Sequence, residues 1–246
     1  MEQQTITAMI PARIGSTRLP MKNLALIDGK PMISYAIEAA RKADIFDKIV
    51  LNSDAALFQT IAQRYGVDFY HRPEHLGSSS TKSDDVVFDF ISKNPCDIIC
   101  WVNPTSPLQT GDEIRSIISH FQKNDLDTLI TVRDHQVHAQ FDNSPLNYTT
   151  SGQFAQTQEL KPVQLFVYSV MMWRSELFVQ EYKKKGYAFF IGNTGFFPVS
   201  RESAIIIKRK EDLFLAEQVV KNLKQGQRDI RYDIAAQNES ISNEKS

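Results

Sequence analysis

The chain has 246 residues, of which 42% are hydrophobic, and a formal net charge of -1. This length supports one α/β domain with a substantial core, and the near-neutral charge argues against binding of nucleic acid or anionic membranes. No apolar run is long enough to cross a membrane and no signal-peptide pattern precedes the first strand, so we expect a cytoplasmic protein.

Short apolar runs alternate with helical patterns through the first half of the chain. Strands are predicted over residues 6–10, 49–52, 67–71, 97–103 and 128–133. Helices are predicted from near Pro31, over 55–65 and over 112–124. Near-continuous apolar strands between such helices are typical of a largely parallel sheet with helices on both faces, so we predict a three-layer α/β fold.

The pattern loosens after residue 133. Residues 134–161 are polar and turn-rich and too long for an ordinary connection, so we expect them to be functional, to form a small hairpin or to meet a partner. Further strands are predicted over 165–173 and 204–207, a solvated helix end at 183–185, and a last helix over 210–224. The polar residues 235–246 are predicted to be a disordered tail.

Two residue pairs are of types that bind metals. Cys96 and Cys100 could share a strand face, but two thiols make neither a disulfide framework nor a complete zinc site, so we interpret them as buried and reduced. His135 and His138 lack a third ligand and a predicted helix, which leaves a metal pair the weaker interpretation.

The segment that carries the chemistry follows the first predicted strand. It reads IPARIGSTRLPMKN over residues 10–23 and places three cations, Arg13, Arg18 and Lys22, around a glycine–serine turn. Ligands of open α/β sheets bind at the carboxyl ends of strands, where such cations can neutralise a triphosphate and the charge that builds on a leaving pyrophosphate. The alternative is a solvated basic loop without a ligand.

Gly15 and Ser16 have the properties expected of a phosphate-binding turn. Glycine permits positive φ and close approach of the backbone, successive N–H groups can form an anion-binding nest, and the Ser16 hydroxyl adds a donor. The patterns G-x-x-x-x-G-K-[ST] and G-x-G-x-x-G are both absent, which argues against ATPase-type and dinucleotide-binding proteins. The segment therefore predicts a triphosphate site of another kind.

This opening resembles that of the cytidylyltransferases that activate acidic sugars, above all the CMP-acylneuraminate synthetases and more distantly the CMP-Kdo synthetases. The family pattern I-P-A-R-x-G-S-x-R-x-x-x-K-N is matched almost position for position. Further matching stretches lie at 29–33, 52–54, 62–66, 72–76, 103–108 and 210–217. The resemblance implies a Rossmann-like nucleotide-diphospho-sugar transferase fold, with a single domain over 1–230 and an extension over 134–173 for dimerisation or the acceptor pocket.

The resemblance also implies a reaction and a set of roles. CTP and a 2-keto sugar acid would give a CMP-sugar and pyrophosphate, with Arg13 and Lys22 as catalytic cations in a homodimer. The implied nucleotide-binding residues are Arg13, Gly15, Ser16, Arg18, Lys22, Asn23, Arg72 and Ser83. The implied acceptor-binding residues are Asn103, Thr105, Ser106, Gln158 and Tyr168. Composition and motifs alone do not distinguish CTP from UTP.

The metal site of the family is where this sequence departs from the pattern. Family members bind Mg²⁺ through two aspartates before the last helix, and Ile206 and Lys208 occupy those positions here. Three explanations stay open: Lys208 replaces the metal charge, another carboxylate such as Asp54 helps the phosphates to hold Mg²⁺, or the chain is a weak or silent relative. Asp54 also suits an N-cap of the following helix, the interpretation that we prefer.

The acceptor region departs from the family as well. Where the family shows N-G-A-I-Y, residues 168–172 read YSVMM. The loss of the asparagine and the glycine predicts an altered sugar pocket. Its acceptor need not be N-acetylneuraminate and could be another nonulosonic acid, a Kdo-like acid or an acidic group such as a phosphonate.

Overall fold

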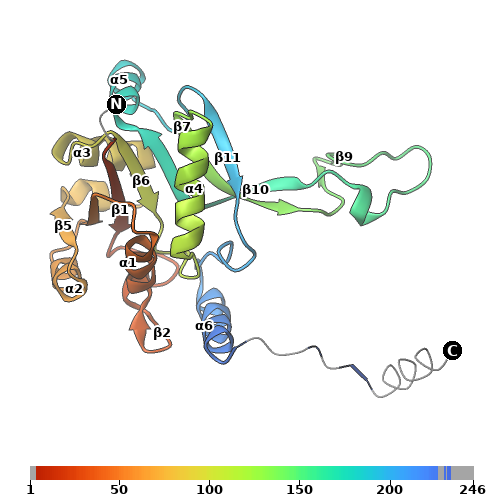
Figure 1. Cartoon of the computed structure of the whole chain (residues 1–246), viewed down its shortest axis with the longest axis horizontal. Helices are drawn as coiled ribbons and strands as arrows, with labels where there is room; N and C mark the ends of the chain where they lie inside the picture. The colour runs from red at the N-terminus through yellow and green to blue at the C-terminus, as the bar shows by residue number, and fades with distance from the viewer. Residues whose placement is uncertain (1–3, 227–229, 231, 234–246) are drawn as a thin grey trace.

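The computed structural model describes residues 4–226, 230, 232 and 233 and contains a seven-stranded sheet covered by helices (Figure 1). The strand order is β11-β7-β10-β6-β1-β4-β5. The strands are β1 (Ile6–Ala12), β4 (Lys48–Ser53), β5 (Asp68–His71), β6 (Ile98–Val102), β7 (Thr128–His135), β10 (Val163–Arg174) and β11 (Thr194–Pro198). β10 is antiparallel to β6 and β7 and the other pairings are parallel, which confirms the mostly parallel sheet.

Helices cover both faces of the sheet, as predicted. They are α1 (Met32–Ala43), α2 (Leu57–Tyr65), α3 (Ser83–Lys93), α4 (Gly111–Lys123), α5 (Ser175–Lys185) and α6 (Lys210–Lys224). Side chains of α1, α2 and α4 form one large core cluster, and side chains of α3 and α5 form a second. Along β1, Ala8 and Ile10 belong to the first cluster and Met9 to the second, so this strand is buried on both faces.

The predicted helices follow from their apolar spacing. In α1, Ile33, Ala36, Ile37 and Ala40 lie at helical spacing and all four are buried, while Pro31 holds the extended N-cap position. The final helix spans the predicted residues 210–224. Its Ala216 and Val220 pack with the short β2 (Leu26–Ile27), which pairs with β3 (Lys30–Pro31) in a two-stranded sheet.

A long arm leaves the sheet between β7 and β10 and reaches away from the body of the molecule (Figure 1). It carries the antiparallel pair β8 (Gln140–Phe141) and β9 (Ser144–Pro145), so the predicted hairpin is confirmed. The ring of His138 stacks on Phe154 with centroids 4.1 Å apart, and its Nε2 lies 3.0 Å from the carbonyl oxygen of Ala155. His138 therefore belongs to a small aromatic cluster that holds the arm together.

The predicted strand over 204–207 is wrong, because these residues form a turn followed by irregular chain. Ala204 and Ile206 pack against the first core cluster, whereas Ile205 and Ile207 pack with Ile27 in a third cluster. Successive side chains therefore alternate between two cores, as they would in a strand, although the segment pairs with no neighbouring strand among the described residues. Two helices, α3 and α5, and the strand β11 were not predicted as elements, although α5 ends at the predicted basic run 183–185.

The cysteines do not share a strand face, although their spacing would have allowed it. Cys100 is buried in the first core cluster, whereas Cys96 precedes β6 and packs against the second cluster on the other side of the sheet. Both thiols are free, as predicted, but only Cys100 is buried, whereas Cys96 is half-buried. Within the described part of the chain, no helix has the length and apolarity needed to span a bilayer. The predicted tail over 235–246 lies outside the described residues.

Candidate active site

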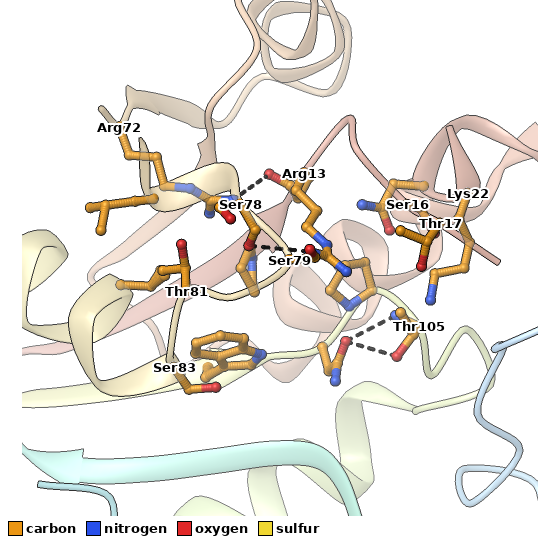
Figure 2. A pocket seen from close by; sticks show the side chains of 18 of the residues that line it. Arg13, Ser16, Thr17, Lys22, Arg72, Ser78, Ser79, Thr81, Ser83 and Thr105 are labelled. Carbon is orange, nitrogen blue, oxygen red and sulfur yellow. Dashed lines mark hydrogen bonds between the residues drawn. The ribbon is translucent and has the colours of Figure 1, made fainter. Parts of the chain in front are cut away.

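A cavity lies where the carboxyl ends of the central strands meet the loop after β1 (Figure 2). Ala12 ends β1, Arg72 follows β5 and Asn103 follows β6, so strands far apart in the chain each deliver a residue to one place. The residues that line it are Pro11, Ala12, Arg13, Ser16, Thr17, Arg18, Lys22, Asn23, Arg72, Leu76, Ser78, Ser79, Thr81, Lys82, Ser83, Val86, Trp101, Asn103, Pro104 and Thr105.

The charge of this cavity wall is positive. Five cationic side chains line it, and the lining contains no aspartate, glutamate or histidine. The cations are Arg13, Arg18, Lys22, Arg72 and Lys82. In Figure 2, Lys22 lies on the same side as Thr105, while the hydroxyl residues Ser78, Ser79, Thr81 and Ser83 lie on the opposite side of Arg13. Cations combined with hydroxyl donors are the chemistry that binds phosphate groups.

Lys22 is the cation most altered by its surroundings. Its Nζ donates a hydrogen bond to the carbonyl oxygen of Ile207 at 2.9 Å, and the short helical turn Lys22–Leu24 fixes its backbone. Burial, and after it the charges of Arg18 and Arg13, lower the pKa of Lys22 to about 8. A group close to its titration point in a cluster of like charges gains from a bound anion, because the anion offsets both the repulsion and the lost hydration.

Arg72 is a buried part of the cavity wall. Its Nη2 donates to the Ala12 carbonyl oxygen at 3.2 Å and lies 3.4 Å from Asp54 Oδ1, and its Nη1 donates to the Asn52 carbonyl oxygen at 3.2 Å. The side chains of Arg72 and Asp54 are only 4% and 8% exposed. The predicted N-cap role of Asp54 is therefore wrong: α2 begins after Ala56, without a side-chain cap, and Asp54 forms a buried ion pair.

Several buried polar atoms at this cavity lack a partner. In the described residues, four buried side-chain atoms have no hydrogen bond, and three of them belong to the cavity lining: Asn23 Oδ1, Arg72 Nε and Trp101 Nε1. Buried polar groups are normally satisfied by protein, water or ligand, so unpaired atoms gathered at one cavity indicate a binding site. The fourth atom is Gln109 Oε1, whose residue does not line the cavity.

Asn103 joins the cavity to an irregular part of β10. Its Oδ1 accepts from the Thr105 backbone N–H at 3.1 Å and hydroxyl at 2.9 Å, and its Nδ2 donates to the Tyr168 carbonyl oxygen at 3.1 Å. The β7–β10 register shifts between Phe166 and Met171, and Tyr168 within that interval has a φ of 58°. A bulge of this kind beside a cavity re-aims the strand. Asn103 therefore positions the Tyr168 segment next to the cavity.

The structure brings together many of the residues predicted for the site. Of the predicted nucleotide-binding residues, those that line the cavity are Arg13, Ser16, Arg18, Lys22, Asn23, Arg72 and Ser83. Asn103 and Thr105 line it from the predicted acceptor-binding set.

Four predicted residues do not line this cavity. Ser106 is buried and its hydroxyl donates to the Ser203 carbonyl oxygen, while Gln158 lies on the arm in a short helical turn. Tyr168 adjoins the cavity through its carbonyl group. Gly15 lines a neighbouring hollow beside Asp54 and Gly77.

The predicted special backbone of Gly15 is wrong. Gly15 is not among the glycines with positive φ, and no atom would lie within 4 Å of an added Cβ. The Ser16 N–H already donates to the Ile14 carbonyl oxygen at 2.9 Å, so it is unavailable to an anion nest. Side chains rather than a backbone nest therefore supply the positive charge.

Sequence reasoning missed one wall of the cavity. Ser78, Ser79, Thr81 and Lys82 line it, and the Ser78 carbonyl oxygen accepts from Arg13 Nη1 at 3.2 Å. The signal was present as the hydroxyl-rich run SSSTK over 78–82. Its meaning depends on α3, which the sequence analysis did not predict and which begins directly after the run at Ser83.

The described residues do not fit a protein-bound Mg²⁺. Magnesium prefers carboxylate oxygens, yet the cavity lining has none, and no group of three or more His, Cys, Asp or Glu residues gathers among the described residues. Asp54 is held by Arg72, and Asp212 Oδ2 accepts the backbone N–H groups of Lys208 and Arg209, each at 2.8 Å. Both carboxylates are therefore engaged in holding the protein together.

The fold and the cavity are those of an α/β protein with a cation-lined cavity at its strand ends, and comparison with known proteins identifies the family. The Cytidylyltransferase family model matches residues 7–241, so the chain belongs to this family. It is similar to the CMP:2-keto-3-deoxy-manno-octonic acid synthetase structure complexed with CTP, with a TM-score of 0.66, 16% identity and coverage of 88% of this chain and 98% of that one. That likeness confirms the fold.

Two curated relatives show the range of the sequence similarity. The N-acylneuraminate cytidylyltransferase of Streptococcus agalactiae serotype V is 25% identical over 215 residues, covering 83% of this chain and 50% of the relative. The pseudaminic acid cytidylyltransferase of Campylobacter jejuni is 37% identical over 122 residues, covering 47% of this chain and 53% of the relative. The chain thus spans about half the length of these relatives.

Proposed function

We propose that this chain transfers CMP from CTP to an acidic 2-keto sugar and releases pyrophosphate. The observation that carries the proposal is the cavity at the strand ends, lined by five cations and no carboxylate, in a member of the cytidylyltransferase family. A triphosphate supplies the negative charge that this wall lacks.

The proposed reaction depends on positioning and on charge. The anomeric hydroxyl of the acceptor attacks the α-phosphorus while the bond to the leaving pyrophosphate breaks, and negative charge grows on the pyrophosphate. Arg13 and Lys22 lie on the same loop and would neutralise that charge, and Arg18 and Lys82 would hold the phosphates from either side. Asn23, Arg72 and Ser83 would bind the nucleoside end.

The acceptor would bind beside the bulge in β10. Thr105 lines the cavity there, and Asn103 holds both Thr105 and the Tyr168 carbonyl group, which makes it a positioning residue as well as part of the wall. Trp101 adds an indole N–H without a partner. We propose a nonulosonic acid as the acceptor, because relatives named for two different acids of this kind match the chain.

The arm is proposed as a dimerisation element. Phe166, Phe190 and Phe196 are 41%, 57% and 38% exposed. The ring centroid of Phe166 lies 6.4 Å from that of Phe190 and 5.5 Å from that of Phe196. Exposed aromatic groups at the base of a projecting arm indicate an interface. Gln158 on this arm would reach an acceptor only across such an interface, since it does not line the cavity of its own chain.

Calorimetric titration with CTP and a pyrophosphate-release assay with candidate sugar acids test the proposal. We expect CTP to bind in the micromolar to millimolar range and at least one nonulosonic acid to support pyrophosphate release. Arg13→Ala should lower turnover by about 10²-fold or more, because it removes a donor to the developing charge. A chain that binds no nucleoside triphosphate at millimolar concentration contradicts the proposal.

A silent nucleotide-binding relative is the second candidate. The observation that favours it is that Ile206 and Lys208 occupy the positions of the family's metal-binding aspartates. It predicts CTP binding without turnover for every acceptor tested, with or without divalent ions. Any acceptor-dependent pyrophosphate release excludes this candidate.

A further inference from the structure

The segment before α6 reaches the wall of the cavity. The Ile207 N–H donates to the Thr105 carbonyl oxygen at 2.8 Å, and the Ile207 carbonyl oxygen accepts from Lys22 Nζ at 2.9 Å. Thr105 and Lys22 both line the cavity. These two bonds hold the Ile207 backbone at the cavity edge and so place Lys208, the next residue, beside the cavity, while the Ile206 side chain packs against the core.

Lys208 brings a further positive charge to this edge. Its side chain is exposed, and its charge is one of those that lower the pKa of Lys22. Its backbone is anchored, because its N–H donates to Asp212 Oδ2 at 2.8 Å in the first turn of α6. The start of a helix carries positive partial charge, so backbone and side chain act in the same direction here.

A divalent cation is unfavourable at this edge. It would lie near Arg13, Arg18, Lys22 and Lys208, whose charges repel it. The carboxylate that raises the pKa of Lys22 is that of Asp212, and it already accepts hydrogen bonds from two backbone N–H groups. A triphosphate with about four negative charges near neutral pH is attracted by the same cations. Complexation with Mg²⁺ removes two of those charges and weakens the attraction.

We propose that Lys208, together with Lys22, neutralises the triphosphate in place of Mg²⁺, so that the chain binds metal-free CTP and transfers CMP without a divalent ion. The inference rests on the proposed function. In the transfer, the acceptor oxygen forms its bond to the α-phosphorus, the bond from that phosphorus to the bridging oxygen breaks, and the electron pair leaves with pyrophosphate. The hydroxyl proton passes to water, and the lysines supply charge without being consumed.

Calorimetric titration of the whole chain with CTP, once in EDTA and once in excess Mg²⁺, tests the inference without any acceptor. We expect CTP to bind at least about threefold more tightly in EDTA, because the free nucleotide carries more charge. Lys208→Ala and Lys208→Gln should each weaken binding in EDTA by about tenfold. Lys184→Ala is the matched control, since it removes an exposed lysine at the end of α5 and should leave binding unchanged.

The charge-reversal variant Lys208→Asp gives the reciprocal test. It places a carboxylate beside the cavity, so CTP should bind weakly in EDTA and more tightly when Mg²⁺ is added. Tighter binding of CTP to the wild-type chain in Mg²⁺, or unchanged binding by both Lys208→Ala and Lys208→Gln, overturns the inference and leaves the proposed function standing. Absence of CTP binding under both conditions overturns the proposed function as well. Thermal melting shows that each variant is folded.

Discussion

At the scale of single residues, the sequence motif located the positive charge but not the way it is held. Arg13, Arg18 and Lys22 line one cavity, as their spacing around the loop predicted. The structure adds the bond from Lys22 to Ile207, about 185 residues further along the chain, which no local pattern reveals. For Asp54, the local pattern gave the wrong role. Its place after β4 suggested a helix cap, but its carboxylate pairs with Arg72, which follows the neighbouring strand β5.

The charge on Lys22 predicts how CTP binding depends on pH. The pKa of Lys22 is lowered to about 8 in the free protein, and bound phosphates would raise it. CTP should therefore bind with its full affinity below about pH 8, where Lys22 is charged in the free protein. Above that pH the affinity should decrease, by up to about tenfold per pH unit, until the pKa of Lys22 in the complex is reached. Calorimetric titration from pH 7 to pH 9 measures this decrease.

Lys22→Arg is the control for that titration. A guanidinium stays charged throughout this range, so the variant should bind CTP with an affinity that is nearly constant between pH 7 and pH 9. An equal decrease in both proteins would assign the titration to another group.

At the scale of elements, glycine placement determines how closely two helices approach. A Cβ at Gly111, the first residue of α4, would lie 2.7 Å from the Ala43 backbone nitrogen at the end of α1. The backbone cannot retreat as a flexible side chain can, and the Ala43 carbonyl oxygen also accepts from Arg115 Nε at 3.1 Å. The contact between α1 and α4 therefore requires glycine at this position.

Gly111→Ala should lower the free energy of unfolding by about 1–3 kcal/mol, because overpacking displaces α4 from α1. Urea denaturation followed by circular dichroism measures the change. Ser116→Ala on the exposed side of α4 is the control and should stay within about 0.5 kcal/mol of the wild type. A Gly111→Ala protein as stable as this control would show that the helices separate without cost.

At the scale of the whole molecule, the arm between β7 and β10 projects from the body of the chain (Figure 1), and aromatic side chains at its base are exposed. If the proposed dimer forms there, Phe166→Arg places a charge in the interface and should shift the molecular mass measured by light scattering from that of a dimer to that of a monomer. Leu223→Arg alters another exposed apolar residue, on α6, and should leave the mass unchanged. A wild-type chain that is monomeric at micromolar concentration contradicts the proposal.

The sequence by itself determined the features that local patterns encode. Apolar runs and helical spacing predicted β1, α1 and α6 because each buries an apolar face, and the motif at 10–23 predicted a cationic cavity at the end of the first strand. The turn-rich composition of 134–161 indicated a hairpin as one of three alternatives, and the arm contains one.

The tertiary structure alone decided what depends on contacts between distant segments. The antiparallel direction of β10 follows from its pairing with β6 and β7, and the irregular course of 204–207 follows from two core clusters that take alternate side chains. The same is true of Lys208, whose sequence position marked a missing aspartate. Its approach to the cationic cavity depends on the bonds of Ile207 to Thr105 and Lys22, which form only when residues far apart in the chain are brought together by folding.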